Sequence, residues 1–436
     1  MPGLSRNALR PRQVVGLALL HSLLFALLYI ILFQAGEFKE WPNANNLIKW
    51  DAGFYQSIQE HGYISEPEEK NNLAFFPLFP WLWRLLAYLG IGVAAMCLFN
   101  FSLFLAGLYL LSRAFLQPGF SGLMLYLSIP SLLFFFLPFS EAAFFFCSSL
   151  FLAGLFRDKL HWAAIGIFLS ALARPSALFF IPALIFVEAM AWKKEGSLSA
   201  INWKRVVVLT SALAFGFVAV AFYQWAQTGE WLAFWKVRGA NWDNGFRWPS
   251  LPLSTWDGSR MMWLDGLAFS VASFSFLLAV WLALQPKLLK FKQWPQLPET
   301  FYFSAAYLAM LCLFALFFQA RNEGGGSNLM AMNRYVIATP FFAVLFFHFW
   351  EKSPKVPRAL FFLGAYLFVM LLLFGTFLPS NLPNHLRTVA YFLLLFAGAW
   401  VHHQQKWRWI LAAVYAANLG LAAVLLHKYL LGGWIG

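Results

Sequence analysis

The residues in this sequence that could do chemistry are a few charged side chains at the borders of long apolar segments. Two are acids, Asp51 and Glu141, and two are arginines, Arg174 and Arg334. An ionised acid at a membrane border is unfavourable unless it is paired or has a task, and a carboxylate can accept a proton. An arginine there either reaches towards the membrane surface or binds an anion. We therefore treat these four residues as candidates for proton transfer and anion binding.

Asp51 lies in a stretch that has the pattern of a helix resting on a membrane surface. Trp50, Phe54 and Ile58 recur at four-residue spacing, and Tyr55 stands beside them. This apolar stripe predicts an amphipathic helix with Asp51 in its first turn. An aspartate in that position can also serve only to cap the helix or to complement its dipole. Both interpretations stay open on the residues alone.

The other charged candidates have equally simple alternatives. Glu141 begins an apolar span, where a carboxylate in the first helical turn can be merely structural. Arg174 lies between two short apolar runs and can reach to the interface without binding a ligand. Arg334, followed by Tyr335, poses the same choice.

A later stretch is rich in tryptophan and charge. It contains Trp242, and Arg247 follows shortly after it. Tryptophans at this density are typical of the belt at a membrane interface. They are also the side chains on which the face of a sugar stacks, so this pattern is ambiguous.

The sequence predicts neither a metal site nor a nucleotide site. His61 follows Glu60, but the other acids and histidines are scattered and lack the spacing of metal ligands. The glycines at 324–326 lack the preceding strand and the lysine of a phosphate-binding loop. We therefore expect no metal and no cofactor.

The composition identifies the class of protein. Of the 436 residues, 61% are hydrophobic and 11% are charged, which is too apolar for an ordinary soluble protein. Apolar runs of about 20 residues recur, and as helices they can cross a hydrocarbon core of about 30 Å. Backbone groups must pair internally in the membrane, so the spans are helical. We predict an all-α polytopic membrane protein with one integral membrane domain over residues 1–436.

The net charge of +13 reflects the orientation of the chain rather than binding to nucleic acid. With the N-terminus in the cytoplasm, the excess of basic residues falls in short cytoplasmic loops, as the positive-inside rule expects. Residues 73–90, which contain Pro77 and Pro80, are predicted to form a broken or re-entrant helix. About thirteen spans are predicted, at residues 14–33, 91–112, 121–137, 142–156, 160–173, 175–191, 206–225, 263–285, 301–319, 336–350, 359–378, 389–401 and 410–430.

The predicted outer segments hold most of the acids and the distinctive polar residues. They are residues 34–72, with the Trp-Asp pair and the amphipathic helix; 138–141; 226–262, rich in tryptophan; and 320–335, rich in glycine. No loop is long enough to bury a core of its own. An active surface must therefore be built from the spans and these outer segments.

Short motifs in the chain occur in the order and spacing of a known family. They are Trp50-Asp51-Ala52, Glu60-His61-Gly62-Tyr63, Ala74-Phe75-Phe76-Pro77-Leu78-Phe79-Pro80, Phe139-Ser140-Glu141, Ala173-Arg174-Pro175, Trp242 with Arg247-Trp248-Pro249, and Asn333-Arg334-Tyr335 leading to Pro340. Through them the chain resembles the PIG-V family, GPI mannosyltransferase 2 and its prokaryotic relatives. The motifs extend over most of the chain, and the block in the first outer segment is the most specific.

The resemblance implies a GT-C-type glycosyltransferase with its site on the extracytoplasmic side. The donor would be a mannose linked to a polyprenyl phosphate of the dolichyl or undecaprenyl type, and the acceptor a hydroxyl of a glycolipid or glycan. Asp51 would act as the base of an inverting displacement, and Glu141 would orient hydroxyl groups. Residues implied in substrate binding are Trp50, Tyr55, Glu60, His61, Arg174, Trp242, Arg247, Arg334 and Tyr335, with Arg174 and Arg334 meeting the phosphate.

The resemblance also implies the membrane in which the protein works. In a bacterium, the site would face the periplasm from the inner membrane; in a eukaryote, it would face the lumen of the endoplasmic reticulum. Two other functions remain open. A transporter or flippase for lipid-linked saccharides would need broken helices in an internal repeat and charges midway through the spans. A non-catalytic subunit would keep the fold without the chemistry.

Overall fold

The computed structural model describes most of the chain. The described residues are 8–65, 71–241, 245–255, 261–288, 297–318, 326–352, 373–374, 382–404 and 408–436. Trp242 and most of the predicted span at 359–378 lie outside them, as does the part of segment 320–335 that precedes residue 326.

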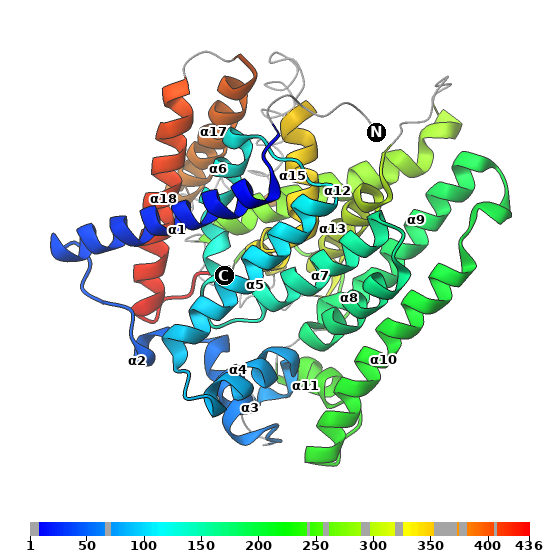
Figure 1. The fold of residues 1–436 in the computed structure, drawn as a ribbon, viewed down its shortest axis with the longest axis horizontal. Helices are drawn as coiled ribbons and strands as arrows, with labels where there is room; N and C mark the ends of the chain where they lie inside the picture. The colour runs from blue at the N-terminus through cyan, green and yellow to red at the C-terminus, as the bar shows by residue number, and fades with distance from the viewer. Residues whose placement is uncertain are drawn as a thin grey trace.

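Within the described residues the fold is helical, apart from one isolated bridge between Ser254 and Asn328 (Figure 1). The α-helices and the short 3₁₀ helices (η) are, in chain order, α1 (Pro11–Gln34), α2 (Ala44–Leu47), α3 (Asp51–His61), η1 (Asn72–Ala74), α4 (Leu78–Tyr88), α5 (Val93–Ala114), α6 (Phe120–Ser128), η2 (Pro130–Phe135), α7 (Glu141–Phe156), α8 (Leu160–Ala173), η3 (Pro175–Phe179), α9 (Phe180–Glu195), η4 (Leu198–Ala200), α10 (Trp203–Thr228), α11 (Ala233–Asn241), α12 (Met262–Leu288), α13 (Glu299–Phe317), α14 (Met332–Val336), α15 (Pro340–Lys352), α17 (Leu382–Gln404) and α18 (Arg408–Leu430).

Seven helical stretches among the described residues are long and apolar enough to cross a membrane. They are α1, α5, η3 together with α9, α10, α12, α13 and α18. The prediction of a helical, multi-pass membrane protein is therefore confirmed. The predicted spans other than 359–378 all overlap helices, several of them shorter than a full span, so the number thirteen stays a prediction.

The predicted span at 121–137 is not one continuous α-helix. Helix α6 ends at Ser128, and the chain continues from Pro130 as the 3₁₀ helix η2. Proline has no N–H to donate, and it disfavours helical backbone angles in the residue before it. Ile129 is accordingly extended, with φ −60° and ψ 121°. Pro130 thus divides a run that apolar composition alone would join.

The break expected in residues 73–90 is present. After η1, helix α4 begins directly after Pro77 and has 11 residues. At 1.5 Å per residue it is about 16 Å long, too short to cross a membrane. Pro80 lies in its first turn, where the missing N–H is tolerated.

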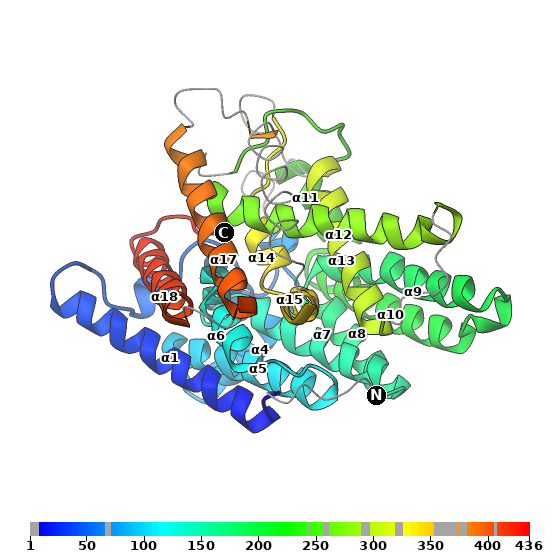
Figure 2. The same ribbon diagram turned by 90° about the horizontal axis from the view of Figure 1, so that it is seen from above.

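Helix α7 is central in the molecule and lies between α5 and α13 (Figure 2). It also packs against α8, and the two backbones approach closely at glycines. A Cβ atom on Gly154 would lie 2.4 Å from the backbone nitrogen of Ala163, and one on Gly166 would lie 2.4 Å from that of Phe151. Small residues allow such close packing between membrane helices, where the hydrophobic effect contributes little.

Helices α3, α4 and α11 gather at one end of the molecule, to the left of the lower part of α10 in Figure 1. Gln224, near the end of α10, donates a hydrogen bond to the carbonyl of Leu73 (2.8 Å) and accepts one from the backbone N–H of Phe234 in α11 (3.1 Å). Gln227 accepts a bond from the N–H of Tyr63 (2.7 Å). Two glutamines of α10 therefore hold parts of segments 34–72 and 226–262 together.

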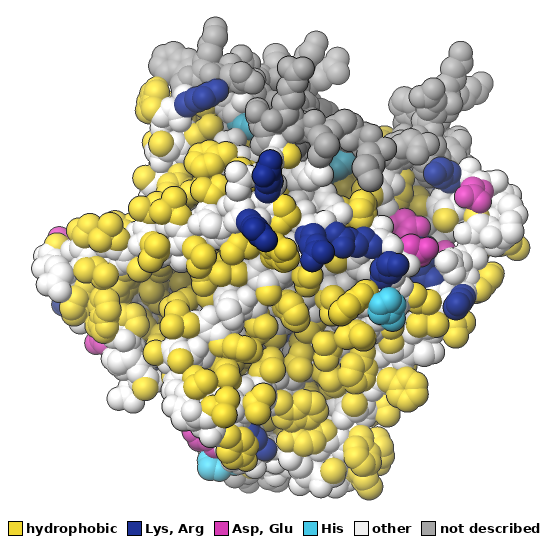
Figure 3. All heavy atoms as spheres, in the orientation of Figure 1, with side chains coloured by type: hydrophobic (Ala, Val, Ile, Leu, Met, Phe, Trp, Pro, Cys, Tyr) yellow, Lys and Arg dark blue, Asp and Glu magenta, His cyan; other side chains and the backbone are white. Residues whose placement is uncertain are grey.

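The surface suits a lipid environment. Figure 3 shows hydrophobic side chains over most of one face, below a band of Lys and Arg. On α1, Leu19, Leu23 and Leu27 are 45%, 67% and 52% exposed, at a spacing that places them on one side of the helix. Such an exposed apolar stripe is typical of a helix that faces lipid.

Candidate functional site

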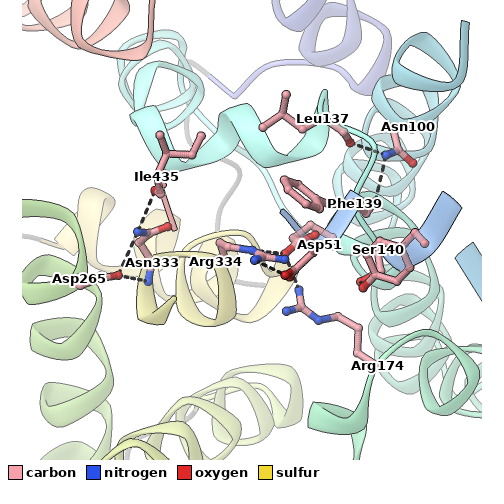
Figure 4. A network of polar contacts seen from close by, with 12 residues as sticks. Asp51, Asn100, Leu137, Phe139, Ser140, Arg174, Asp265, Asn333, Arg334 and Ile435 are labelled. Atoms are coloured by element: carbon pink, nitrogen blue, oxygen red, sulfur yellow. Dashed lines mark hydrogen bonds and ion pairs between the residues drawn. The ribbon is translucent and has the colours of Figure 1, made fainter. Parts of the chain in front are cut away.

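Four charged residues from distant parts of the chain meet in one cluster, which we call the ion cluster (Figure 4). Arg334 donates from Nε to Glu141 Oε1 at 2.7 Å and from a terminal nitrogen to Asp51 Oδ2 at 2.8 Å. Arg174 forms an ion pair with the same Glu141 Oε1 at 3.2 Å. The cluster contains two cations and two anions, so its formal charges cancel.

The members of the ion cluster differ in exposure. The side chain of Glu141 is fully buried, and those of Arg174 and Arg334 are 6% and 4% exposed, whereas that of Asp51 is 18% exposed. Burial alone would lower the pKa of Arg334, but the carboxylates of Glu141 and Asp51 raise it well above its ordinary value. Glu141 likewise outweighs burial at Arg174 and raises its pKa. Both arginines stay charged, and Asp51 is the acid most open to a ligand.

Helix α3 places Asp51. The helix begins at Asp51, so the residue in the capping position is Trp50, whose side chain makes no capping bond. The carboxylate of Asp51 binds Arg334 instead, although its place in the first turn still suits the helix dipole. Trp50 has φ 56°, an angle that residues other than glycine rarely adopt. That turn sets its ring edge-on against Trp434, with ring centroids 5.2 Å apart.

The amphipathic character predicted for α3 is present, but the buried face is shifted. Ala52, Tyr55 and Ile58 are buried, whereas Trp50 is 40% exposed. At its C-terminal end, Arg84 of α4 donates to the carbonyls of Gln59 (2.5 Å) and Ile58 (2.7 Å). An arginine at the end of a helix stabilises its last carbonyls.

The turn before α7 places Glu141. Asn100 of α5 is fully buried and donates from Nδ2 to the carbonyls of Leu137 (2.6 Å) and Phe139 (3.0 Å). These bonds satisfy backbone groups that the turn leaves without helical partners. Sequence reasoning missed Asn100; the signal was an amide within an otherwise apolar span.

Tyr55 ties α3 to the same turn. Its hydroxyl donates to Ser140 Oγ at 2.7 Å. Burial and the neighbouring charge of Glu141 raise the pKa of Tyr55 above its ordinary value, so it remains a donor. Asp51 and Glu141 are thus held in register by the helix and the turn that carry them.

Helix α14 places Arg334. The backbone N–H and the Nδ2 of Asn333 both donate to Oδ1 of Asp265, which is buried in α12, at 3.0 Å and 2.9 Å. The guanidinium group of Arg334 lies over the ring of Phe139, 4.6 Å from its centroid. Asp265 is a further residue that the sequence did not single out; its signal was an acid inside a long apolar helix.

Arg174 lies where α8 ends, before Pro175. Its guanidinium group is 4.6 Å from the centroid of the Tyr335 ring, a cation–π contact. Tyr335 follows Arg334 on α14. Arg174 therefore contacts the same short helix that carries Arg334.

A cavity of about 1090 Å³ lies beside the ion cluster. Asp51, Arg174, Arg334 and Tyr335 are in its wall, as are Trp50, Tyr55 and Trp434. Most other lining residues are apolar and come from η3, α9, α10 and α13. Large apolar cavities with a few convergent polar groups are the usual form of ligand sites. This one suits a ligand that has both a polar and an apolar part.

The remaining candidates lie elsewhere. Glu60 and His61 are at the far end of α3, exposed, 3.6 Å from each other and outside the cavity lining. Arg247 is also outside the lining, and its backbone N–H donates to the carbonyl of Phe317 at 2.7 Å. Among the described residues, no three His, Cys, Asp or Glu side chains are grouped so that they could hold a metal ion.

Comparison of the chain with protein-family models, with curated proteins and with solved structures finds no match.

Proposed function

We propose that this protein is a membrane glycosyltransferase of GT-C type. It would transfer a sugar, mannose by the resemblance in its motifs, from a polyprenyl-phosphate donor to a hydroxyl of a glycolipid or glycan. The proposal rests on one observation above all. The most exposed carboxylate of the ion cluster, Asp51, lies in the wall of a large cavity that is polar at one part and apolar elsewhere.

In this proposal Asp51 is the general base. Its Oδ2 is held by Arg334, and within the described part of the chain no group donates a hydrogen bond to its Oδ1. Oδ1 would take the proton of the acceptor hydroxyl as that oxygen bonds to the anomeric carbon. The bond from that carbon to the phosphate oxygen breaks, and its electron pair leaves with the phosphate. Phosphate is already a good leaving group, so one base suffices.

In this proposal Glu141 has a different role from the one that the motif resemblance implies. It is fully buried and is absent from the cavity lining, so it cannot reach a substrate hydroxyl in this arrangement. Its Oε1 instead binds both arginines. We assign Glu141 to positioning, because it holds Arg334, and Arg334 in turn orients Asp51.

The sugar would lie beside Asp51 and against the two tryptophans. Trp50 and Trp434 both line the cavity, and Trp50 is 40% exposed. Aromatic faces next to a carboxylate suit a sugar, which has an apolar face and a rim of hydroxyls. For localisation we keep the proposal of a bacterial inner membrane with the site facing the periplasm, or the lumen of the endoplasmic reticulum in a eukaryote.

The test is Asp51→Asn, assayed in membranes with a polyprenyl-phosphate sugar and an extracted lipid acceptor. Asparagine keeps the shape but cannot take the proton, so transfer should fall by about 10²-fold or more. The matched control is Glu230→Gln, an exposed acid outside the cavity lining, which should keep full activity. Full activity of folded Asp51→Asn protein would show that Asp51 is not the general base. Movement of donor between leaflets without transfer would point to a transporter instead.

A further inference from the structure

The cavity contains a third arginine that the ion cluster does not use. Arg174 and Arg334 each have a carboxylate partner, so any phosphate that binds them must compete with Glu141 or Asp51. Arg238 also lines the cavity, and it forms no ion pair with any residue that the structure describes. The lining therefore carries one cation whose charge is not balanced by an acid of the cluster.

Helix α11 aims Arg238 at the cavity. Trp235 and Arg238, three residues apart and so on the same side of the helix, both line it. Ala233 and Val237 are buried on the other side. The helix is fixed from α10 by the bond from the Phe234 N–H to Gln224, and Gln224 is itself fully buried. Arg238 is therefore carried on an element with a defined orientation.

The apolar part of the cavity continues to the molecular surface. Phe217 and Val218 of α10 line it, as do Leu313 and Phe314 of α13. Val218 is 58% exposed, and it belongs to α10, a helix long and apolar enough to cross a membrane. Exposed apolar lining on such a helix faces lipid rather than water. A hydrocarbon chain can therefore extend along this wall from the cavity into the bilayer.

We infer that Arg238 binds the phosphate of the lipid carrier, while the carrier's hydrocarbon chain lies along α10 and α13. The inference rests on the proposed function and proposes Arg238, rather than Arg174 or Arg334, as the main contact of the phosphate. A guanidinium group binds phosphate through two parallel hydrogen bonds, and Arg238, which has no acid partner among the described residues, gives up none of the described ion pairs in doing so. The long apolar wall favours a lipid phosphate over a free one.

The experiment measures binding of tritiated undecaprenyl phosphate to the purified full-length protein in detergent. Variants are Arg238→Ala and Arg238→Lys. The matched control is Lys236→Ala, which removes a cation from the same helix; Lys236 pairs with Glu230 at 2.7 Å, is 64% exposed and is absent from the lining. Competition with unlabelled undecaprenol and with inorganic phosphate separates the chain from the head group.

We expect Arg238→Ala to weaken binding of undecaprenyl phosphate by about 10- to 100-fold, the usual effect of losing a charged hydrogen bond. Arg238→Lys should bind with intermediate affinity, and Lys236→Ala like the unaltered protein. Undecaprenol, which lacks the phosphate, should compete equally with label bound to either protein, which shows that the apolar wall of the variant is intact. Inorganic phosphate alone should not compete at millimolar concentration.

Two results would overturn the inference, and they differ in whether they also contradict the proposed donor. If Arg238→Ala binds undecaprenyl phosphate as tightly as the unaltered protein, the phosphate contact lies elsewhere, and the proposed transferase stands. If the unaltered protein itself does not bind undecaprenyl phosphate above the level of undecaprenol, both this inference and the proposed donor are wrong.

Discussion

Glu141 shows how one residue can organise a site that it does not enter. A single oxygen, Oε1, accepts both arginines, while Oε2 is buried without a hydrogen-bond partner in the described structure. A buried carboxylate in this state is stable only because two cations compensate for the water that it has lost. Arg334 lies between Glu141 and Asp51 and binds both of them. The orientation of Asp51, the proposed base, therefore depends on the buried charge of Glu141.

The corresponding prediction is that Glu141→Gln destabilises the protein. The change leaves two buried arginines with only Asp51 as an acidic partner, and breaking a buried pair in this way costs about 3–5 kcal/mol. Thermal unfolding in detergent should show a markedly lower midpoint. The matched control is Glu230→Gln, which breaks the exposed pair with Lys236 and should cost less than about 1 kcal/mol. Equal midpoints for the two variants would contradict this account of the ion cluster.

At the scale of elements, the close contact of α7 with α8 determines where the two ends of the ion cluster lie. Glu141 is the first residue of α7, and Arg174 directly follows the last residue of α8. The two helices approach at Gly154 and Gly166, where no room exists for a Cβ atom. Their separation therefore sets how near Arg174 comes to the Glu141 carboxylate.

We expect Gly166→Ala to separate α7 from α8. The added methyl group would lie 2.4 Å from a backbone atom of Phe151, which cannot rotate away, so the helices must shift at a cost of about 1–3 kcal/mol. Transfer activity should fall together with the unfolding midpoint. Gly420→Ala in α18 is the control, because no atom lies within 4 Å of the place that its methyl group would take, and alanine there should be neutral or slightly stabilising. Indistinguishable behaviour of the two would refute the close contact.

At the scale of the whole molecule, polar contacts at both ends of α10 connect this helix to other segments of the chain. At one end, Gln227 binds Tyr63 of segment 34–72 and Gln224 binds Phe234 of α11; at the other, Arg205 binds Glu188 of α9 at 2.6 Å and Glu299 of α13 at 2.5 Å. Helices α9, α10 and α13 supply much of the apolar cavity wall. Polar contacts outside the ion cluster thus help to hold the helices of this wall.

Cysteine labelling in intact cells tests the predicted orientation of this arrangement. The native cysteines, Cys97, Cys147 and Cys312, are buried and should not react. Glu60→Cys, at the end of α3, should react with a membrane-impermeant maleimide in intact spheroplasts. Lys159→Cys, in the turn between α7 and α8, should react only after the membrane is permeabilised. Labelling of both positions from the same side would contradict the topology.

The sequence could reveal charged residues at membrane borders, where a charge is unfavourable unless it is paired or has a task. Asp51, Glu141, Arg174 and Arg334 stood out for that reason, and the structure brings all four together. Roles that depend on a distant partner could not be read in the same way. The sequence analysis did not single out Arg238, which the fold places in the cavity wall with no ion-pair partner among the described residues.

Local signals also had limits. Apolar length joined residues 121–137 into one predicted span, whereas in the structure the helix of this segment is divided at Pro130. The buried face of α3 consists of Ala52, Tyr55 and Ile58, and it shares only Ile58 with the predicted stripe of Trp50, Phe54 and Ile58. Tyr55, through its bond to Ser140, determined that face.

The exposed apolar lining at Val218 has a consequence for how the protein would meet the proposed donor. A ligand that enters through the side of a helix bundle never leaves the plane of the bilayer, so its encounter with the protein is a search in two dimensions. The quantity that governs occupancy is then the number of donor molecules per unit area of membrane. Adding inert lipid to the bilayer would lower the occupancy of the site. Diluting the same vesicles in buffer would leave the occupancy unchanged.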